Sequence, residues 1–122
     1  GQLVSLAEVR DVLLEHPFLR AAEVVSVADP RSGRRIVACV ASTSDALAGP
    51  NLASELVATV RETLGGLARP QTVLFVDQFG TDLADDARRR ALAVVAASVN
   101  EATAHVTWSQ VQAAATLQAG PT

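Results

Sequence analysis

The chain has 122 residues, of which 49% are hydrophobic and 19% charged, and its formal net charge at pH 7 is −3. This length and apolar content are those of one domain, which can bury an ordinary core without disulfides or structural metals. The acidic balance argues against nucleic acid or an anionic membrane surface as a partner, and the longest apolar runs are far below the roughly 20 residues of a membrane span. All ten basic residues are arginine, so this sequence offers no lysine amine to catalysis.

The single cysteine, Cys39, lies inside an apolar run and can form no internal disulfide. Residues 1–9 lack the basic start and apolar core of a secretory leader. Together these features fit a reducing setting, and we expect a cytoplasmic chain.

The first half of the chain predicts a helix, a β-hairpin and a second helix. Ser5-Leu6-Ala7-Glu8 has the form of a capping box, and it predicts a helix from about residue 6 to 15 that Pro17 ends. Two runs rich in β-branched residues, 22–28 and 35–41, flank turn residues and predict a hairpin. Asn51 can cap the second helix, which Gly65-Gly66 ends.

The second half predicts a strand over 72–76 and a helix over 82–99, with Asp82, Asp85 and Asp86 in the first turn of that helix. A second capping box, Thr107-Trp108-Ser109-Gln110, predicts a short last helix that ends at Gly120-Pro121. The order α-β-β-α-β-α-α indicates an α+β fold, a small three-stranded sheet covered by helices. We expect a domain over 1–100 and a helical extension over 101–122.

Several short strings, in this order, resemble the C-terminal domain of the adenylate-forming enzymes, which include the acyl-CoA synthetases. Residues 7–9 and 13–17 are similar to "AEVE…LLxHP", residues 21–30 with Gly33 to "AAVVGVPDPxxG", residues 64–70 to "LGPLAxP", and Val76-Asp77 to the start of "VDxLPxTxSGKxxRR". The likeness runs from Gly1 to about Leu92. The collinearity of the strings makes the resemblance specific, although each string alone is weak.

The resemblance implies a mobile lid that works with a large N-terminal adenylating domain. In that family, the lid delivers a lysine to the step in which ATP and a carboxylic acid form an acyl-adenylate. It then rotates and admits coenzyme A, or the pantetheine of a carrier protein, to the second step. The implied partners are therefore the adenylating domain and, in some members, a carrier protein.

The chain departs from the motif at the point that matters most. Aligning Val76-Asp77 and Arg89-Arg90 with it places Asp86 at the lysine position, and Gly80 stands where the motif has proline. An aspartate repels phosphate where the family supplies attraction. We therefore expect no catalytic residue in this chain, and no adenylation by it, unless Arg88 or Arg89 takes over the role.

A second departure lies at the start of the chain, where Leu3 stands at the arginine of the family's "GxRI" loop while Gly1 and Glu8 are kept. The family's hinge residue would precede Gly1. The residues that we expect to contact a cofactor, ATP/AMP or coenzyme A, are Gly1, Glu8, Arg31, Arg34 and Arg89.

Each feature also has a purely structural interpretation. Arg88-Arg89-Arg90 also suits a solvated helix face, and Arg31, Arg34 and Arg35 a solvated turn. Cys39 fits a core position and His16 a helix end, and the histidines, cysteine and carboxylates have no metal-ligand spacing. Trp108 either packs the tail onto its own domain or anchors another protein. The alternative function is accordingly a non-catalytic scaffold module in a biosynthetic assembly.

Overall fold

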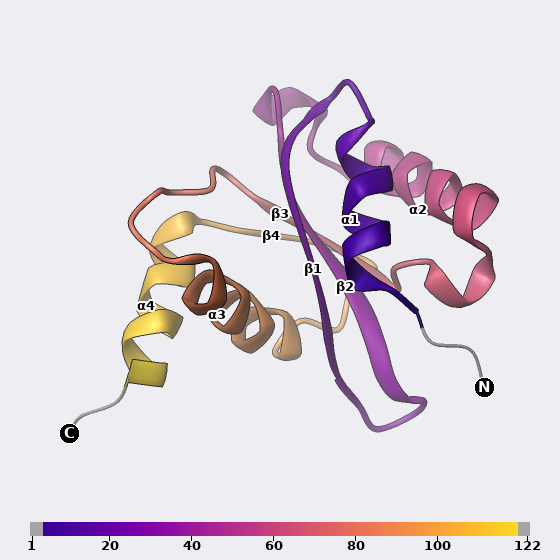
Figure 1. The fold of residues 1–122 in the computed structure, drawn as a ribbon. Helices are drawn as coiled ribbons and strands as arrows, with labels where there is room; N and C mark the ends of the chain where they lie inside the picture. Colours follow the sequence, from indigo (N-terminus) through magenta and orange to yellow (C-terminus); the bar gives the residue numbers. More distant parts are fainter. Residues whose placement is uncertain (1–3, 120–122) are drawn as a thin grey trace.

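The computed structural model describes residues 4–119, which form a sheet with helices on both faces (Figure 1). The helices are α1 (Leu6–Leu14), α2 (Pro50–Leu64), α3 (Asp85–Ala97) and α4 (Trp108–Ala119), and two 3-10 turns, η1 (Asp45–Leu47) and η2 (Gly66–Ala68), flank α2. The strands are β1 (Leu19–Asp29), β2 (Gly33–Ser42), β3 (Thr72–Val76) and β4 (Thr103–Val106).

The strands lie in the order β1-β2-β3-β4. The hairpin of β1 and β2 is antiparallel, whereas β2 with β3 and β3 with β4 are parallel. At the hairpin tip, the Asp29 carboxylate accepts hydrogen bonds from the Arg31 backbone N–H and the Ser32 hydroxyl. Gly33 has φ +86°, a conformation that glycine adopts at little cost, and it lets β2 begin directly after the turn.

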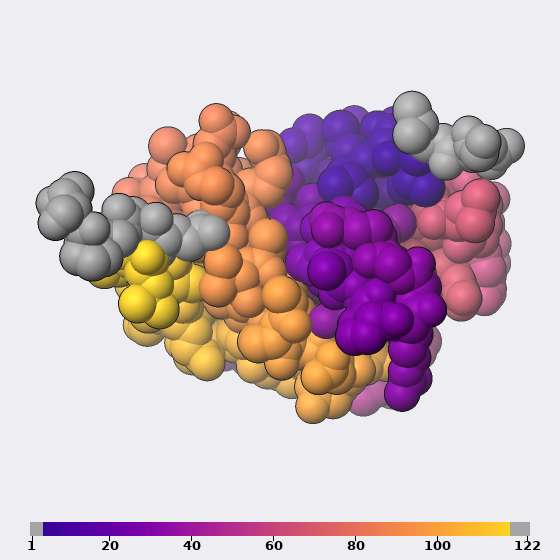
Figure 2. Space-filling view, turned by 90° about the horizontal axis from the view of Figure 1, so that it is seen from below, coloured from indigo at the N-terminus to yellow at the C-terminus, as the bar shows by residue number. Residues whose placement is uncertain are grey.

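Alternating side chains of the strands divide the core into two halves. On one face of the sheet, Val24, Val40 and Phe75 pack against apolar residues of α1 and α2. On the other face, Val25 and Leu74 pack against α3 and α4. The sheet is therefore covered on both sides, which is why β2 and β3 are almost continuously apolar. In the view of Figure 2, the orange and yellow C-terminal segments lie to one side of the purple hairpin and α2 to the other.

The predicted α+β class is confirmed, and so are the four helices, but the three-stranded sheet needs correction. A fourth strand, β4, adds to the outer side of β3, and the element order is α-β-β-α-β-α-β-α. Helix α3 starts three residues later than predicted, so Asp82 lies outside it. Helix α2 is entered through Gly49 and Pro50, and Asn51 is not its cap. The predicted end at Gly120-Pro121 lies outside the described residues.

Both predicted helix starts are confirmed, but only the second has both hydrogen bonds of a capping box. The Glu8 backbone N–H donates to Ser5 Oγ at the start of α1. At the start of α4, the Gln110 side-chain oxygen accepts from the Thr107 N–H while the Gln110 N–H donates to Thr107 Oγ1. None of the helices in the described part of the chain is long and apolar enough to cross a membrane.

Candidate functional site

The segment that carries the resemblance to the lysine motif leaves β3 at Val76 and enters α3 at Asp85. Ala84 is the N-cap residue, and Asp85 and Asp86 occupy the first turn of the helix, where negative charge stabilises the helix dipole. Both aspartate side chains are exposed, at 82% and 80%. Asp86, the residue expected at the lysine position, is thus on the surface at a helix N-terminus.

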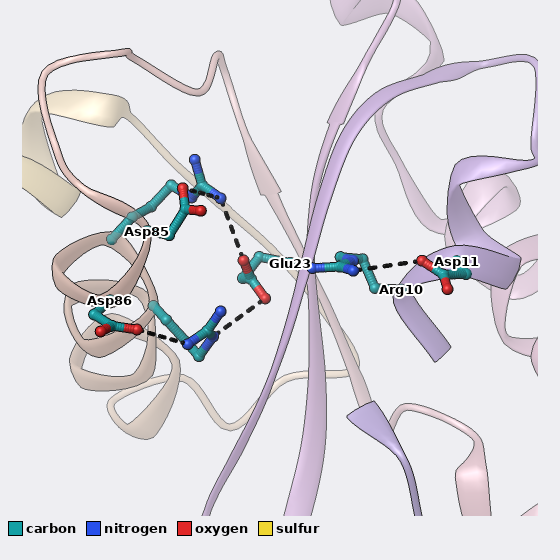
Figure 3. A network of polar contacts seen from close by, with 7 residues as sticks. Arg10, Asp11, Glu23, Asp85 and Asp86 are labelled. Carbon is teal, nitrogen blue, oxygen red and sulfur yellow. Dashed lines mark hydrogen bonds and ion pairs between the residues drawn. The ribbon is translucent and has the colours of Figure 1, made fainter. Parts of the chain in front are cut away.

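A buried carboxylate faces the arginines of α3 from the sheet. Glu23 of β1 is 4% exposed, and Figure 3 shows its side chain directed at α3 between two guanidinium groups. Glu23 Oε2 lies 3.4 Å from Arg88 Nη2, and Oε1 lies 3.5 Å from Arg89 Nε. The same two arginines also pair along the helix, Arg88 with Asp85 at 3.5 Å and Arg89 with Asp86 at 3.1 Å.

This network decides what Arg88 and Arg89 can do. Each guanidinium is held between one buried and one exposed carboxylate, so the local charge around the start of α3 is already neutralised. Arg88 is further fixed over the Phe79 ring, with Cζ 5.8 Å from its centroid. Glu23 was not among the sequence candidates. Its signal was a charged residue inside the apolar run of β1, where the motif quoted above has a small alanine.

The segment between β3 and α3 is held on its other side by α4. The Asp82 carboxylate accepts from Trp108 Nε1 at 2.9 Å and from Gln112 Nε2 at 2.8 Å. These two hydrogen bonds, that of Gln112 first, lower the pKa of Asp82 below its ordinary value. Trp108 is 5% exposed and packs in the core of its own chain. In this fold it therefore holds the C-terminal tail on its own domain. Asp82 therefore does not cap α3.

A hollow on the α2 side of the sheet carries two further arginines. It has a volume of about 480 Å³, and its lining includes Arg61 from the last turn of α2 and Arg69 from the loop before β3. Neither guanidinium makes an ion pair or a hydrogen bond with any residue in 4–119. The floor is small and apolar, and Ser54 and Thr103 add hydroxyls. Unpaired arginine forks over such a floor suit an organic anion.

Sequence reasoning missed this pair of arginines. Arg69 lies within the string that resembles "LGPLAxP", and Arg61 lies three residues before that string begins. Their convergence depends on the crossing of α2 over the start of β3, which spacing alone does not reveal.

The predicted cofactor-contacting residues are not brought together by the fold. Glu8 is exposed on α1, on one face of the sheet, and Arg89 is on α3, on the opposite face. Arg31 is exposed at the hairpin tip, and Arg34 donates to the Ser26 carbonyl oxygen at 2.6 Å. Gly1 lies outside the described residues.

Arg35, weighed with Arg31 and Arg34 as a contact for phosphate, has a structural role. Its side chain is buried, and it donates to Thr72 Oγ1 at 3.1 Å and to the Ala96 carbonyl oxygen at 3.1 Å. Arg35 thus joins β2 to β3 and to the end of α3.

The remaining candidates lie in structural positions. Cys39 is completely buried, and burial raises the pKa of its thiol, with a smaller effect from Glu23. His16 follows α1, accepts from the Phe18 N–H through Nδ1 and contacts Glu55 of α2. No group of three metal-ligating side chains occurs within residues 4–119.

Comparison with known proteins places this geometry in a family. Residues 8–81 match the AMP-binding enzyme C-terminal domain. Acetyl-coenzyme A synthetase 1 of Candida albicans is 33% identical over 100 residues, which is 80% of this chain and 15% of the synthetase. An acyl-CoA synthetase of Brucella canis is 32% identical, with a TM-score of 0.59 over 64% of this chain and 14% of that protein.

A malonyl-CoA ligase, solved in a ternary product complex with methylmalonyl-CoA and AMP, is also 32% identical and superposes with a TM-score of 0.56 over 63% of this chain and 16% of the ligase. The chain thus spans about one seventh of the length of these relatives. The matched segment contains most of α1 and the whole of the hairpin, α2 and β3. The chain belongs to the AMP-binding enzyme C-terminal domain family.

Proposed function

We propose that this chain is the lid of an AMP-forming acyl-CoA synthetase-like enzyme, and that it serves the thioester-forming step without supplying a cation to adenylation. It acts with an N-terminal adenylating domain, which binds ATP and the acid, and it is inactive alone. The thiol substrate is coenzyme A or the pantetheine arm of a carrier protein.

The observation that carries the proposal is the distribution of paired and unpaired arginines. At the start of α3, the expected lysine position holds Asp86, and Arg88 and Arg89 are both engaged by carboxylates. A phosphate placed there meets no free positive charge from these residues. On the opposite face, Arg61 and Arg69 are unpaired in a hollow and are available to the phosphates of a coenzyme.

The test separates the two half-reactions. A lidless adenylating domain of the acetyl-CoA-synthetase type is mixed with this chain, and two rates are followed: pyrophosphate release from ATP and acid, and thioester formation from preformed acyl-adenylate and coenzyme A. The chain is expected to accelerate the second rate and leave the first unchanged. No binding to the adenylating domain, or no effect on thioester formation, overturns the proposal.

Matched arginine variants identify the surface that is used. Arg61→Ala and Arg69→Ala are each expected to raise KM for coenzyme A by about ten- to one-hundred-fold, since a hydrogen bond to a charged group contributes about 1.5–3 kcal/mol. Arg90→Ala is the control, because Arg90 is an exposed arginine of the α3 surface that takes no part in the network of Glu23. An equal effect of all three variants contradicts a specific role for the hollow.

Asp86→Lys tests the charge reversal itself. The variant restores a cation at the position that the resemblance assigns to the lysine, and it is expected to bring back adenylation in the mixed system. If Asp86→Lys restores no adenylation while thioester formation stays normal, the absence of the lysine is not the only change that prevents the first step.

A further inference from the structure

The segment from Asp77 to Ala84 is bound by its own C-terminal helix through three residues of that segment. Asp77 Oδ1 accepts the Trp108 backbone N–H at 2.7 Å, so this carboxylate is tied to the first residue of α4. Phe79 stacks on the indole of Trp108, with ring centroids 6.1 Å apart. Asp82 receives the side-chain N–H groups of Trp108 and Gln112, which project from one face of α4 at i and i+4.

Gly80 lies directly under the indole. A Cβ added at this position would lie 2.2 Å from Trp108 Nε1 and 2.7 Å from Asp82 Oδ1, closer than side-chain atoms can approach. Only glycine therefore lets the backbone come this close to both the indole and the Asp82 carboxylate. The glycine stands where the motif quoted above has proline, so the departure at this position and the packing of Trp108 go together.

We propose that α4 is an intramolecular clamp on the segment 77–84, with the Asp82 carboxylate as its anchor. With α4 docked, the segment has one conformation, and Gly80 and Asp82 are turned to the indole instead of to a second domain. With α4 released, the segment is free to move, while the hairpin and β3 keep their own packing against α1 and α2. The clamp is a property of the free chain and does not depend on the proposed function.

Gln112→Glu is the most direct perturbation, because it places a carboxylate of equal size against Asp82 and leaves the rest of α4 unchanged. Ala113→Glu is the matched control: it adds the same charge on the same helix at an exposed position one residue further on. Asp82→Asn is a milder second variant, which keeps one acceptor oxygen and serves if Gln112→Glu does not fold. All three are made in the full 122-residue chain.

The measurements are NMR relaxation of the backbone amides and the indole N–H resonance of Trp108, which is a single signal because the chain has one tryptophan. In the unsubstituted chain, the amides of 78–84 are expected to have order parameters of about 0.85, the value of rigid backbone. In Gln112→Glu, they fall below about 0.6, and the indole N–H exchanges about tenfold faster with water. Ala113→Glu changes neither quantity.

Two results overturn the clamp. In the first, the segment is already flexible in the unsubstituted chain or stays rigid in both Gln112→Glu and Asp82→Asn. In the second, amides of β2 and β3 lose their protection from exchange together with the segment, which shows that α4 belongs to one cooperative core and is not a separable clamp.

Discussion

Glu23→Gln isolates the contribution of one buried charge to the stability of this fold. The substitution keeps the size of the side chain but removes its charge, and it leaves Arg88 facing an amide at a buried position. Arg88 Nε is already buried without a hydrogen-bond partner among the described residues, so no acceptor at this nitrogen compensates for the loss of the Glu23 charge. Breaking a buried ion pair costs about 3–5 kcal/mol. Since the side chains of Arg88 and Arg89 are 23% and 45% exposed, water screens part of this, and we expect a loss of about 2–3 kcal/mol.

The matched controls are Asp85→Asn and Asp86→Asn, which make the same chemical change against the same two arginines at exposed positions. Surface pairs contribute about 0–1 kcal/mol, so each control should remain within about 1 kcal/mol of the parent chain. Urea unfolding followed by circular dichroism gives the three free energies, and a thermal melt should show a drop of roughly 10 °C for Glu23→Gln alone. A loss below about 0.5 kcal/mol, or equal losses for all three variants, refutes the reasoning that burial makes Glu23 the principal partner.

Three further outcomes are expected. A chain ended at Asn100 loses β4, and with it the pairing along the outer side of β3, in addition to α4, so circular dichroism should show it largely unfolded, whereas Gln112→Glu, which keeps β4, should stay folded; a cooperative melt of the shortened chain near that of the whole chain would contradict this. The pKa of Asp29 is lowered, chiefly by the Arg31 N–H, and that of Asp82 is lowered, chiefly by Gln112. Both carboxylates therefore stabilise the fold at a pH above their ordinary pKa of 3.8, and they lose this contribution as the pH falls through their lower pKa values in the folded chain. The urea midpoints of Asp29→Asn and the parent chain should converge only in that acidic range. Cys39, whose thiol pKa is raised by burial, should react with a thiol reagent only on unfolding, and rapid labelling of the folded chain would place it outside the core.

The elements that the sequence predicted are those with strong local signals. Turn residues between two β-branched runs specify the hairpin. The N-cap Ser5 marks the start of α1, and a capping box marks the start of α4. The burial of Cys39 followed from its place in an apolar run. Such features depend on neighbours within a few residues, so they can be derived before any long-range contact is known.

Strand β4 was missed because its signal is not local. It has four residues, Thr103–Val106, of mixed polarity, and none is fully buried. The two crossovers that join β2 to β3 and β3 to β4 also depart from the usual topology. Both parallel connections advance in the same direction across the sheet, yet α2 and α3 cover opposite faces, so the two crossovers have opposite hands. A preference for right-handed crossovers would have argued against this arrangement.

The charged residues of the candidate site illustrate the same limit. Asp82 looked like part of the first turn of a helix, and Arg88 and Arg89 like a solvated face, because sequence spacing shows only neighbours along one helix. Their partners, Trp108 with Gln112 and the buried Glu23, lie on α4 and β1. These partners are 26 to 66 residues away, and only the packing of α3 and α4 on the sheet brings them together.

The pairing of charges also separates residues that maintain the fold from residues that remain available to a ligand. The positive charge of a guanidinium between two carboxylates is neutralised by them. Binding of phosphate there would require the displacement of Glu23 or an aspartate. Arg61 and Arg69 need no such displacement, because they line a hollow without an ion pair among the described residues. Under the proposed function, the hollow beside α2, and not the paired guanidinium groups of Arg88 and Arg89, is therefore where an anionic substrate would bind at the lower free-energy cost.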